Sequence, residues 1–163
     1  MYQGILISTL MLFFQARSTL PPRPPTAGAV DEIIFKGFPF QRNVRPAELK
    51  PILGDPLSIT GRGPNNPNGA LHFKGLTIEL REILADGSAK IASIELSDNA
   101  WRFPAKVRIG STRDDVLKLL GRPDIESKSE LTYGCYECVY DDKIHFTFDG
   151  NKVTRIKWDF YLN

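Results

Sequence analysis

The two cysteines are the residues whose spacing most directly suggests chemistry. Cys135 and Cys138 are the only cysteines among 163 residues, within the stretch YGCYECVY at 133–140. In an exported protein, a close pair of cysteines most simply forms a disulfide. Strand residues three apart point to opposite faces, so pairing requires a turn or bulge at Tyr136 and Glu137. We therefore predict a Cys135–Cys138 disulfide that shapes a loop.

Two other uses of these cysteines stay open. His145, together with Asp141 or Asp142, could complete a zinc site with the two thiols, although one Cys-x-x-Cys with one histidine is a weak signal for zinc. A redox site requires the first cysteine at a helix N-terminus, whereas the surroundings here predict strand and loop. We favour the disulfide over zinc and zinc over a redox enzyme, and we predict no cofactor.

Other residues suited to catalysis are few. His72 and His145 are the only histidines, and each lies in an alternating, strand-like segment. The chain lacks the G-x-S-x-G, H-E-x-x-H and phosphate-loop motifs. Asp114 and Asp115 stand together at the start of a predicted helix, where capping explains them better than acid–base catalysis. We predict that the protein is not an enzyme.

Aromatic and charged residues favour binding instead. Tyrosines cluster around the cysteine loop, and tyrosine is enriched in interface hot spots. Trp101 and Phe103 lie farther upstream, and packing in the core explains them equally well. Two basic residues on a polar strand face, Arg155 and Lys157, could contact Glu79 and Arg81 or an acidic partner. A face that is simply exposed to solvent is the simpler explanation. The predicted partner-binding residues are Tyr133, Tyr136, Glu137, Tyr140, Arg155 and Lys157.

Composition and the N-terminus indicate the class of protein and its compartment. A hydrophobic content of 42%, a charged content of 25% and a net charge of +2 are ordinary for a globular protein and do not indicate a nucleic-acid partner. The apolar run ILISTLMLFF at 5–14 is too short to span a bilayer but suits a signal peptide, here 1–18, although MYQG before it lacks Lys and Arg. A buried strand or helix is the alternative. We predict a periplasmic or secreted protein with a Pro-rich linker at 19–30 and no membrane span in the mature chain.

Local signals predict two short helices that end in the same way. One starts at Pro46 and stops at ILGDP, 52–56, while the other is capped by Ser111 or Thr112 and stops at LLGRP, 119–123. Alternating segments after each helix predict strands, and Asp149-Gly150 predicts a tight hairpin. We therefore expect an α+β fold of two tandem helix-plus-antiparallel-sheet repeats, 31–103 and 104–163.

The stretch RIGSTRDDVLKLLGRPD at 108–124 resembles the helix signature of the SmpA/OmlA domain of small outer-membrane assembly lipoproteins. Two tandem copies of such a unit are similar to the β-lactamase inhibitor protein, and the resemblance covers roughly 38–163. It implies that an exposed sheet face is the binding surface. The chain departs from the lipoproteins because it has no cysteine near the predicted cleavage site for lipid attachment.

These observations favour an exported, non-enzymatic protein-binding module. An inhibitor or toxin-immunity protein that binds and neutralises a secreted enzyme or toxin is the leading hypothesis. An accessory protein of outer-membrane or envelope assembly is the alternative. A zinc- or thiol-dependent enzyme centred on Cys135, Cys138 and His145 is the third.

Overall fold

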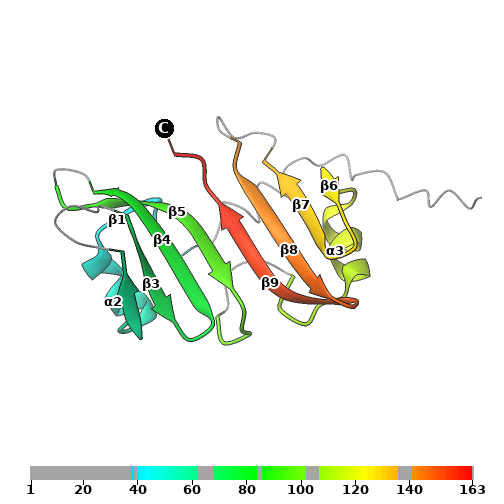
Figure 1. Ribbon diagram of the computed structural model, residues 1–163, viewed down its shortest axis with the longest axis horizontal. Coiled ribbons are helices and arrows are strands. Elements are labelled where there is room, and N and C mark those ends of the chain that lie inside the picture. The colour runs from blue at the N-terminus through cyan, green and yellow to red at the C-terminus, as the bar shows by residue number, and fades with distance from the viewer. Residues whose placement is uncertain are drawn as a thin grey trace, which may run out of the picture.

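The computed structural model describes residues 38, 40–61, 68–83, 86–101, 107–135 and 141–162. This part of the chain forms one antiparallel sheet of nine strands, with two short helices packed on one face (Figure 1). The strand order is β2-β3-β4-β5-β9-β8-β7-β6, and β1 pairs with β5 off this path. The bounds are β1 Asn43–Val44, α2 Pro46–Leu53, β2 Ser58–Thr60, β3 Gly69–Phe73, β4 Leu76–Ile83, β5 Ala89–Leu96, α3 Arg113–Leu120, β6 Ile125–Glu126, β7 Glu130–Gly134, β8 Lys143–Asp149 and β9 Lys152–Asp159.

Helix α3 forms as predicted, because its ends are specified locally. The Thr112 hydroxyl accepts a hydrogen bond from the Asp115 N–H (3.1 Å), and the Asp115 carboxylate accepts one from the Thr112 N–H (2.8 Å). Val116 and Leu120 are buried on the sheet side. Gly121, at a φ of 71°, ends the helix in a conformation that favours glycine.

Helix α2 is confirmed with one difference in its buried stripe. Pro46 occupies the first turn, and Leu49 and Leu53 are buried. Ile52, which the same stripe places in the core, is 44% exposed. A helix of eight residues presents only two turns to the sheet, so a third apolar position is not covered.

A row of register partners on the helix side forms the centre of the hydrophobic core. Ile78 of β4 pairs with Ile94 of β5, which pairs with Trp158 of β9, then Ile144 of β8 and Tyr133 of β7. All five side chains are at most 1% exposed. The predicted hairpins β4–β5 and β8–β9 place these residues in phase, because side chains alternate between the two faces of a strand. The core therefore runs without interruption from one half of the chain to the other.

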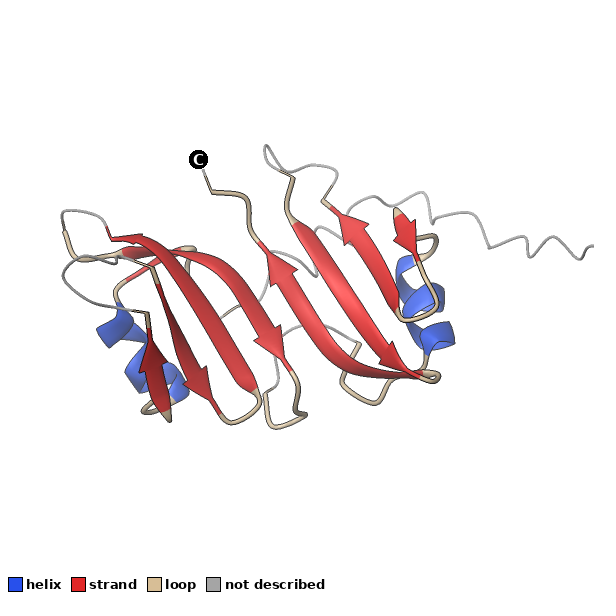
Figure 2. Cartoon of the chain, viewed as in Figure 1, coloured by secondary structure: helices blue, strands red, loops and turns tan. Residues whose placement is uncertain are grey.

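The expected fold class is wrong. Each half contributes one helix and a run of strands, but the strands do not form two helix-plus-sheet repeats. The strands of the two halves join edge to edge, where β5 pairs with β9. This pairing extends from Ser93 opposite Asp159 to Leu96 opposite Ile156. In the described residues, nine strands stand beside two helices of eight residues each, so the protein is mainly antiparallel sheet (Figure 2). On the core face, Ile94 and Leu96 of β5 lie opposite Trp158 and Ile156 of β9, and separate units would leave these apolar side chains more exposed at the edge of each sheet.

The segment before β1 braces the junction of the two halves. The ring of Phe38 packs edge-on against Trp158 of β9, with centroids 5.3 Å apart. The Arg42 guanidinium forms an ion pair with Asp142, which is fully buried, and lies 5.0 Å from the Phe160 ring. The second Asp142 oxygen accepts a hydrogen bond from the Tyr161 N–H at 2.6 Å. One carboxylate thus fastens both the segment before β1 and the segment after β9.

The N-terminal predictions concern residues that the structure does not describe. The signal peptide at 1–18 and the Pro-rich linker at 19–30 lie outside the described residues. Among the residues that are described, no helix is long and apolar enough to cross a membrane. Export to the periplasm or medium stays a prediction.

Candidate partner-binding face

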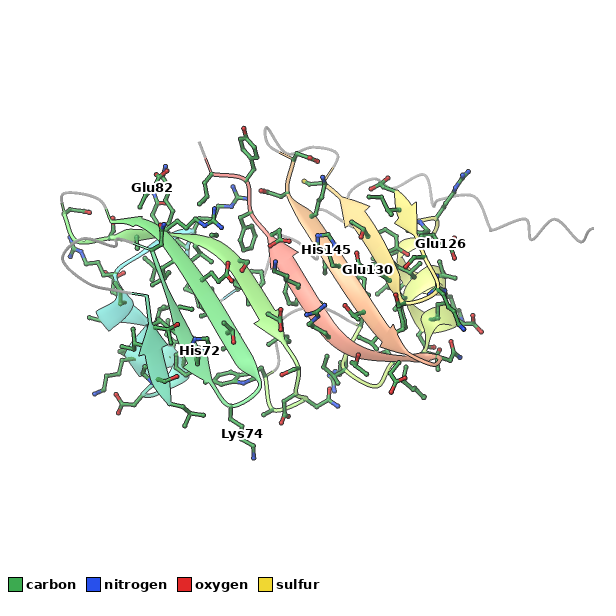
Figure 3. All side chains as sticks on the ribbon, in the orientation of Figure 1. His72, Lys74, Glu82, Glu126, Glu130 and His145 are labelled. Atoms are coloured by element: carbon green, nitrogen blue, oxygen red, sulfur yellow. The ribbon has the colours of Figure 1, made fainter. Side chains whose placement is uncertain are left out.

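The face of the sheet opposite the helices carries a row of polar side chains across its centre. Register pairing joins Thr77 of β4 to Glu95 of β5, Lys157 of β9, His145 of β8 and Thr132 of β7. We call this side of the sheet the open face. In Figure 3 its side chains point toward the viewer, and His145 and Glu130 lie next to each other over β8 and β7. Because these positions alternate with the core residues, the packing of the core fixes which side chains reach the open face.

His145 is the centre of a cluster on this face. Its Nδ1 lies 3.2 Å from Glu130 Oε1, and its Nε2 lies 3.4 Å from Asp159 Oδ2. The Thr132 hydroxyl lies between two of these groups, 3.0 Å from His145 Nδ1 and 2.9 Å from Glu130 Oε1. Lys157 Nζ lies 2.8 Å from the other oxygen of Asp159. Three strands thus contribute to one hydrogen-bonded group, which we call the His145 cluster.

These contacts shift the pKa values of three members. The hydrogen bond to Asp159 raises the pKa of His145 above its ordinary 6.5; burial opposes this, and Glu130 adds to the increase. The hydrogen bond from His145 lowers the pKa of Asp159 below 3.8 against the effect of burial. Burial acts to raise the pKa of Glu130, but hydrogen bonds from Thr132 and His145 outweigh it, and the net change is downward from 4.5. The cluster therefore stabilises the charged form of each group.

A second contact on the open face crosses the junction of the two halves. Arg155 of β9 lies 3.8 Å from Glu95 of β5, and its Nε donates a hydrogen bond to the Thr147 hydroxyl at 3.3 Å. The Arg155 side chain is 47% exposed and that of Glu95 is 33% exposed. The sequence suggested that Arg155 and Lys157 could meet Glu79 and Arg81. In the structure, Arg155 instead meets Glu95 of the neighbouring β5, and Lys157 meets Asp159, two residues further along β9.

The predicted binding residues divide into three groups. Arg155 and Lys157 lie on the open face, as the alternation in β9 suggested. Tyr133 does not belong to a surface, because it is fully buried and its hydroxyl donates a hydrogen bond to the Gly121 carbonyl at 2.9 Å. Its ring packs edge-on against Phe146, with centroids 6.0 Å apart. Three further predicted residues lie outside the described residues: Tyr136, Glu137 and Tyr140.

The structure tests only part of the cysteine predictions. Cys135 follows β7, packs against the hydrophobic core, and its N–H donates a hydrogen bond to the Asp142 carbonyl at 2.9 Å. Cys138 lies outside the described residues, so the disulfide stays a prediction. For the zinc alternative, Cys135 packs on the helix side, whereas His145 bonds to groups on the open face. Within the described residues, no group of three or more His, Cys, Asp or Glu is placed to hold a metal ion.

Sequence reasoning missed most of the polar groups that surround His145. Glu130, Thr132, Asp159 and Glu95 were not among the predicted site residues, although each alternates with core residues in its strand. Alternation gives the face on which a residue lies but not its neighbours on the next strand. The available signal was that all four share a face with His145 or Lys157, and only the register turns that into contacts.

Trp101, considered both for the core and for binding, packs partly against the core. Its ring meets Phe73 edge-on, with centroids 5.8 Å apart, and its indole N–H donates a hydrogen bond to the Lys74 carbonyl at 2.6 Å. Phe103 lies outside the described residues. The link between the two halves therefore contributes a packing residue at Trp101.

Comparison with protein-family models, curated proteins and solved structures finds no match for this chain. The resemblance of 108–124 to the SmpA/OmlA signature, and the likeness to the β-lactamase inhibitor protein, therefore stay predictions. A function has to be argued from the open face itself.

Proposed function

We propose that the protein is a non-enzymatic binding module whose open face binds a protein partner. The observation that supports this proposal is the polar row that continues across both halves of one sheet, from Thr77 through Glu95, Lys157 and His145 to Thr132. Two charged members remain partly accessible, since the side chains of Lys157 and Glu95 are 34% and 33% exposed.

Two physical properties of the open face favour binding: its rigidity and its pattern of charges. Side chains that project from paired strands are held by the backbone ladder, so they lose less freedom on binding than side chains on a loop. Arg155 and Lys157 are already oriented by Glu95 and Asp159, and mixed charges of this kind favour a specific partner of complementary pattern. Arginine is also among the residues enriched in interface hot spots.

Inhibition or immunity is the form of binding that we propose. An inhibitor needs one rigid surface and no catalytic group of its own, which is consistent with an open face built from ion pairs and hydroxyls. Export, if the signal-peptide prediction holds, would place the protein with a secreted enzyme or toxin. An accessory role in envelope assembly would use the same face and is distinguished by the identity of the partner.

The test uses a matched pair of charge reversals. Arg155→Glu changes the open face, and Lys118→Glu makes the same change of charge at an exposed position of α3. The full chain, tagged at its C-terminus, is purified from the native envelope fraction, and proteins recovered in near-equal amount are identified by mass spectrometry. We expect Arg155→Glu to lose the partner and Lys118→Glu to keep it, while circular dichroism shows both variants to be folded.

The result that would contradict the proposal is a partner retained equally by both variants, which would place the binding surface elsewhere. Recovery of an open-face partner that belongs to outer-membrane assembly would replace inhibition by the accessory role. Recovery of one dominant hydrolase or toxin would support inhibition, and an activity assay of that hydrolase with added protein would then measure it.

A further inference from the structure

We propose that the His145 cluster is a pH-operated switch on the open face: His145 holds Glu130 when protonated and releases it when neutral. The released carboxylate is then available to a basic side chain of a partner. The proposal rests on the proposed function, because it names the regulation and the partner chemistry of the same face.

The proposal depends on how many hydrogen bonds the imidazole ring can donate in each protonation state. Protonated imidazole has two N–H donors, so it can hold Glu130 through Nδ1 and Asp159 through Nε2 at the same time. Neutral imidazole has one donor and one acceptor. It cannot donate to both carboxylates, so one of the two contacts is lost when the proton leaves.

The surrounding groups decide which contact is lost. Asp159 is anchored on its other oxygen by Lys157 Nζ, so it stays in place and keeps the N–H at Nε2. Nδ1 then becomes an acceptor, and the Thr132 hydroxyl is 3.0 Å away to donate to it. In the protonated state, that hydroxyl instead donates to Glu130 Oε1 at 2.9 Å. Deprotonation therefore removes both hydrogen bonds from Glu130.

Charged groups on β7, β8 and β9 lie around His145 on the open face. On β7 the group is Glu130, and on β9 the groups are Arg155, Lys157 and Asp159, of which Arg155 is paired with Glu95 of β5. On β8 itself, Lys143 is paired with Asp141. Among these described groups, Glu130 is the one whose two side-chain hydrogen bonds both depend on the protonation state of His145, and the charge of Arg155 acts on it in either state.

The change alters what a partner meets. With His145 protonated, Glu130 is paired and the positive and negative charges of the His145 cluster balance. With His145 neutral, the cluster gains one net negative charge, located on a side chain that is 40% exposed. Partner lysine or arginine side chains would then bind more tightly above the His145 transition than below it. The hydrogen bond to Asp159 raises the pKa of His145, so this transition lies above the ordinary 6.5.

The first measurement needs no partner. The carboxyl carbon of Glu130 and the ring nitrogens of His145 are followed by NMR between about pH 5.5 and about pH 8.5, on either side of the histidine range. We expect a step in the Glu130 signal at the His145 midpoint, with the neutral ring protonated on Nε2. His145→Gln should remove the step.

His72→Gln is the matched control, because His72 lies on the same face between the hydroxyls of Thr60 (2.9 Å) and Thr77 (3.4 Å) and forms no ion pair among the described residues. It should leave the Glu130 step in place. A Glu130 signal that stays constant through the His145 transition, or a step that survives His145→Gln, overturns the switch. Neither result would affect the capture test at Arg155, so failure of the switch and failure of the proposed function can be told apart.

The second measurement tests recognition with a defined probe, the peptide acetyl-Gly-Arg-Gly-amide. Its dissociation constant is measured by NMR titration at both pH values, with acetyl-Gly-Gln-Gly-amide as the uncharged comparison. We expect the arginine peptide to bind about twofold to fivefold more tightly at the higher pH, the range of one exposed ion pair. Glu130→Gln should remove that difference. Equal affinity at both pH values, or a difference that persists in Glu130→Gln, would refute the role of Glu130 in recognition.

Discussion

Asp142→Asn should destabilise the protein strongly, although it only replaces one carboxylate oxygen by an amide NH2 group. The Asp142 carboxylate is buried and accepts hydrogen bonds from the Arg42 guanidinium and the Tyr161 N–H. Removing one charge of a buried ion pair costs about 3–5 kcal/mol. Arg42 is 36% exposed and regains part of its hydration, and asparagine keeps one acceptor for the Tyr161 N–H. We therefore expect the free energy of unfolding to fall by about 2–3 kcal/mol.

The neighbouring residue provides a matched control. Asp141 is 71% exposed and pairs with Lys143 at 2.8 Å, so Asp141→Asn should change the unfolding free energy by less than about 1 kcal/mol. Urea unfolding of the full chain, followed by tryptophan fluorescence at constant pH, measures both variants. Equal effects of the two substitutions, or an Asp142→Asn loss below about 1 kcal/mol, would show that the brace around Asp142 does not fasten the junction.

Three further predictions concern the core, a helix cap and the open face. Tyr133→Phe should cost about 1–2 kcal/mol of unfolding free energy in urea, because it removes the buried hydrogen bond to Gly121, and it should leave partner capture unchanged. Thr112→Ala should cost about 1 kcal/mol by loss of the α3 cap, whereas Thr112→Ser should cost less; equal losses would argue against the cap. The raised pKa of His145 stabilises the fold fully below pH 6.5, and this contribution is lost as pH rises through the folded value. Wild type should therefore exceed His145→Gln in stability near pH 5.5 by more than near pH 8.5 in urea titrations, and a constant difference would contradict this.

Local chemistry made the two helices predictable. Thr112 and Asp115 cap α3 through contacts three residues apart, and Gly121 ends it, so no distant residue is required. The β8–β9 hairpin is equally local, since Asp149 pairs with Lys152 across Gly150, at a φ of 56°, and the residue after it. The exposure of Ile52 was not predictable, because it depends on how far the sheet extends beneath α2.

The single sheet could not be predicted from such signals. Alternation in β5 and β9 placed Ile94 and Trp158 on core faces, but it gave no indication that these two strands pair with each other. A strand edge is satisfied equally by a strand of its own half and by one of the other half, because the backbone groups are identical. The repeated pattern of helix ends favours two separate units, but the pairing of β5 with β9 joins the two halves into one sheet.

Tyr133 shows a signal that was present and misjudged. It is two residues from Leu131 and alternates with Thr132, so the strand period places it on the same side as Leu131, which is also fully buried. Proximity to the cysteines grouped it with Tyr136 and Tyr140 as a binding residue. Because a strand alternates strictly, phase within the strand is better evidence for a side chain's face than nearness to a motif.

The origin of the open-face residues links binding to the joining of the two halves. Arg155 and His145 lie on β9 and β8, which pair through their own hairpin, whereas Glu95 of β5 meets Arg155 only because β5 pairs with β9. That pairing involves four register pairs, and the Arg42–Asp142 ion pair fastens the chain beside it. Loosening the brace would therefore separate Glu95 from Arg155 without altering either side chain. The polar row consequently depends on residues on the far side of the sheet, and any binding that uses the whole row requires the junction to be closed.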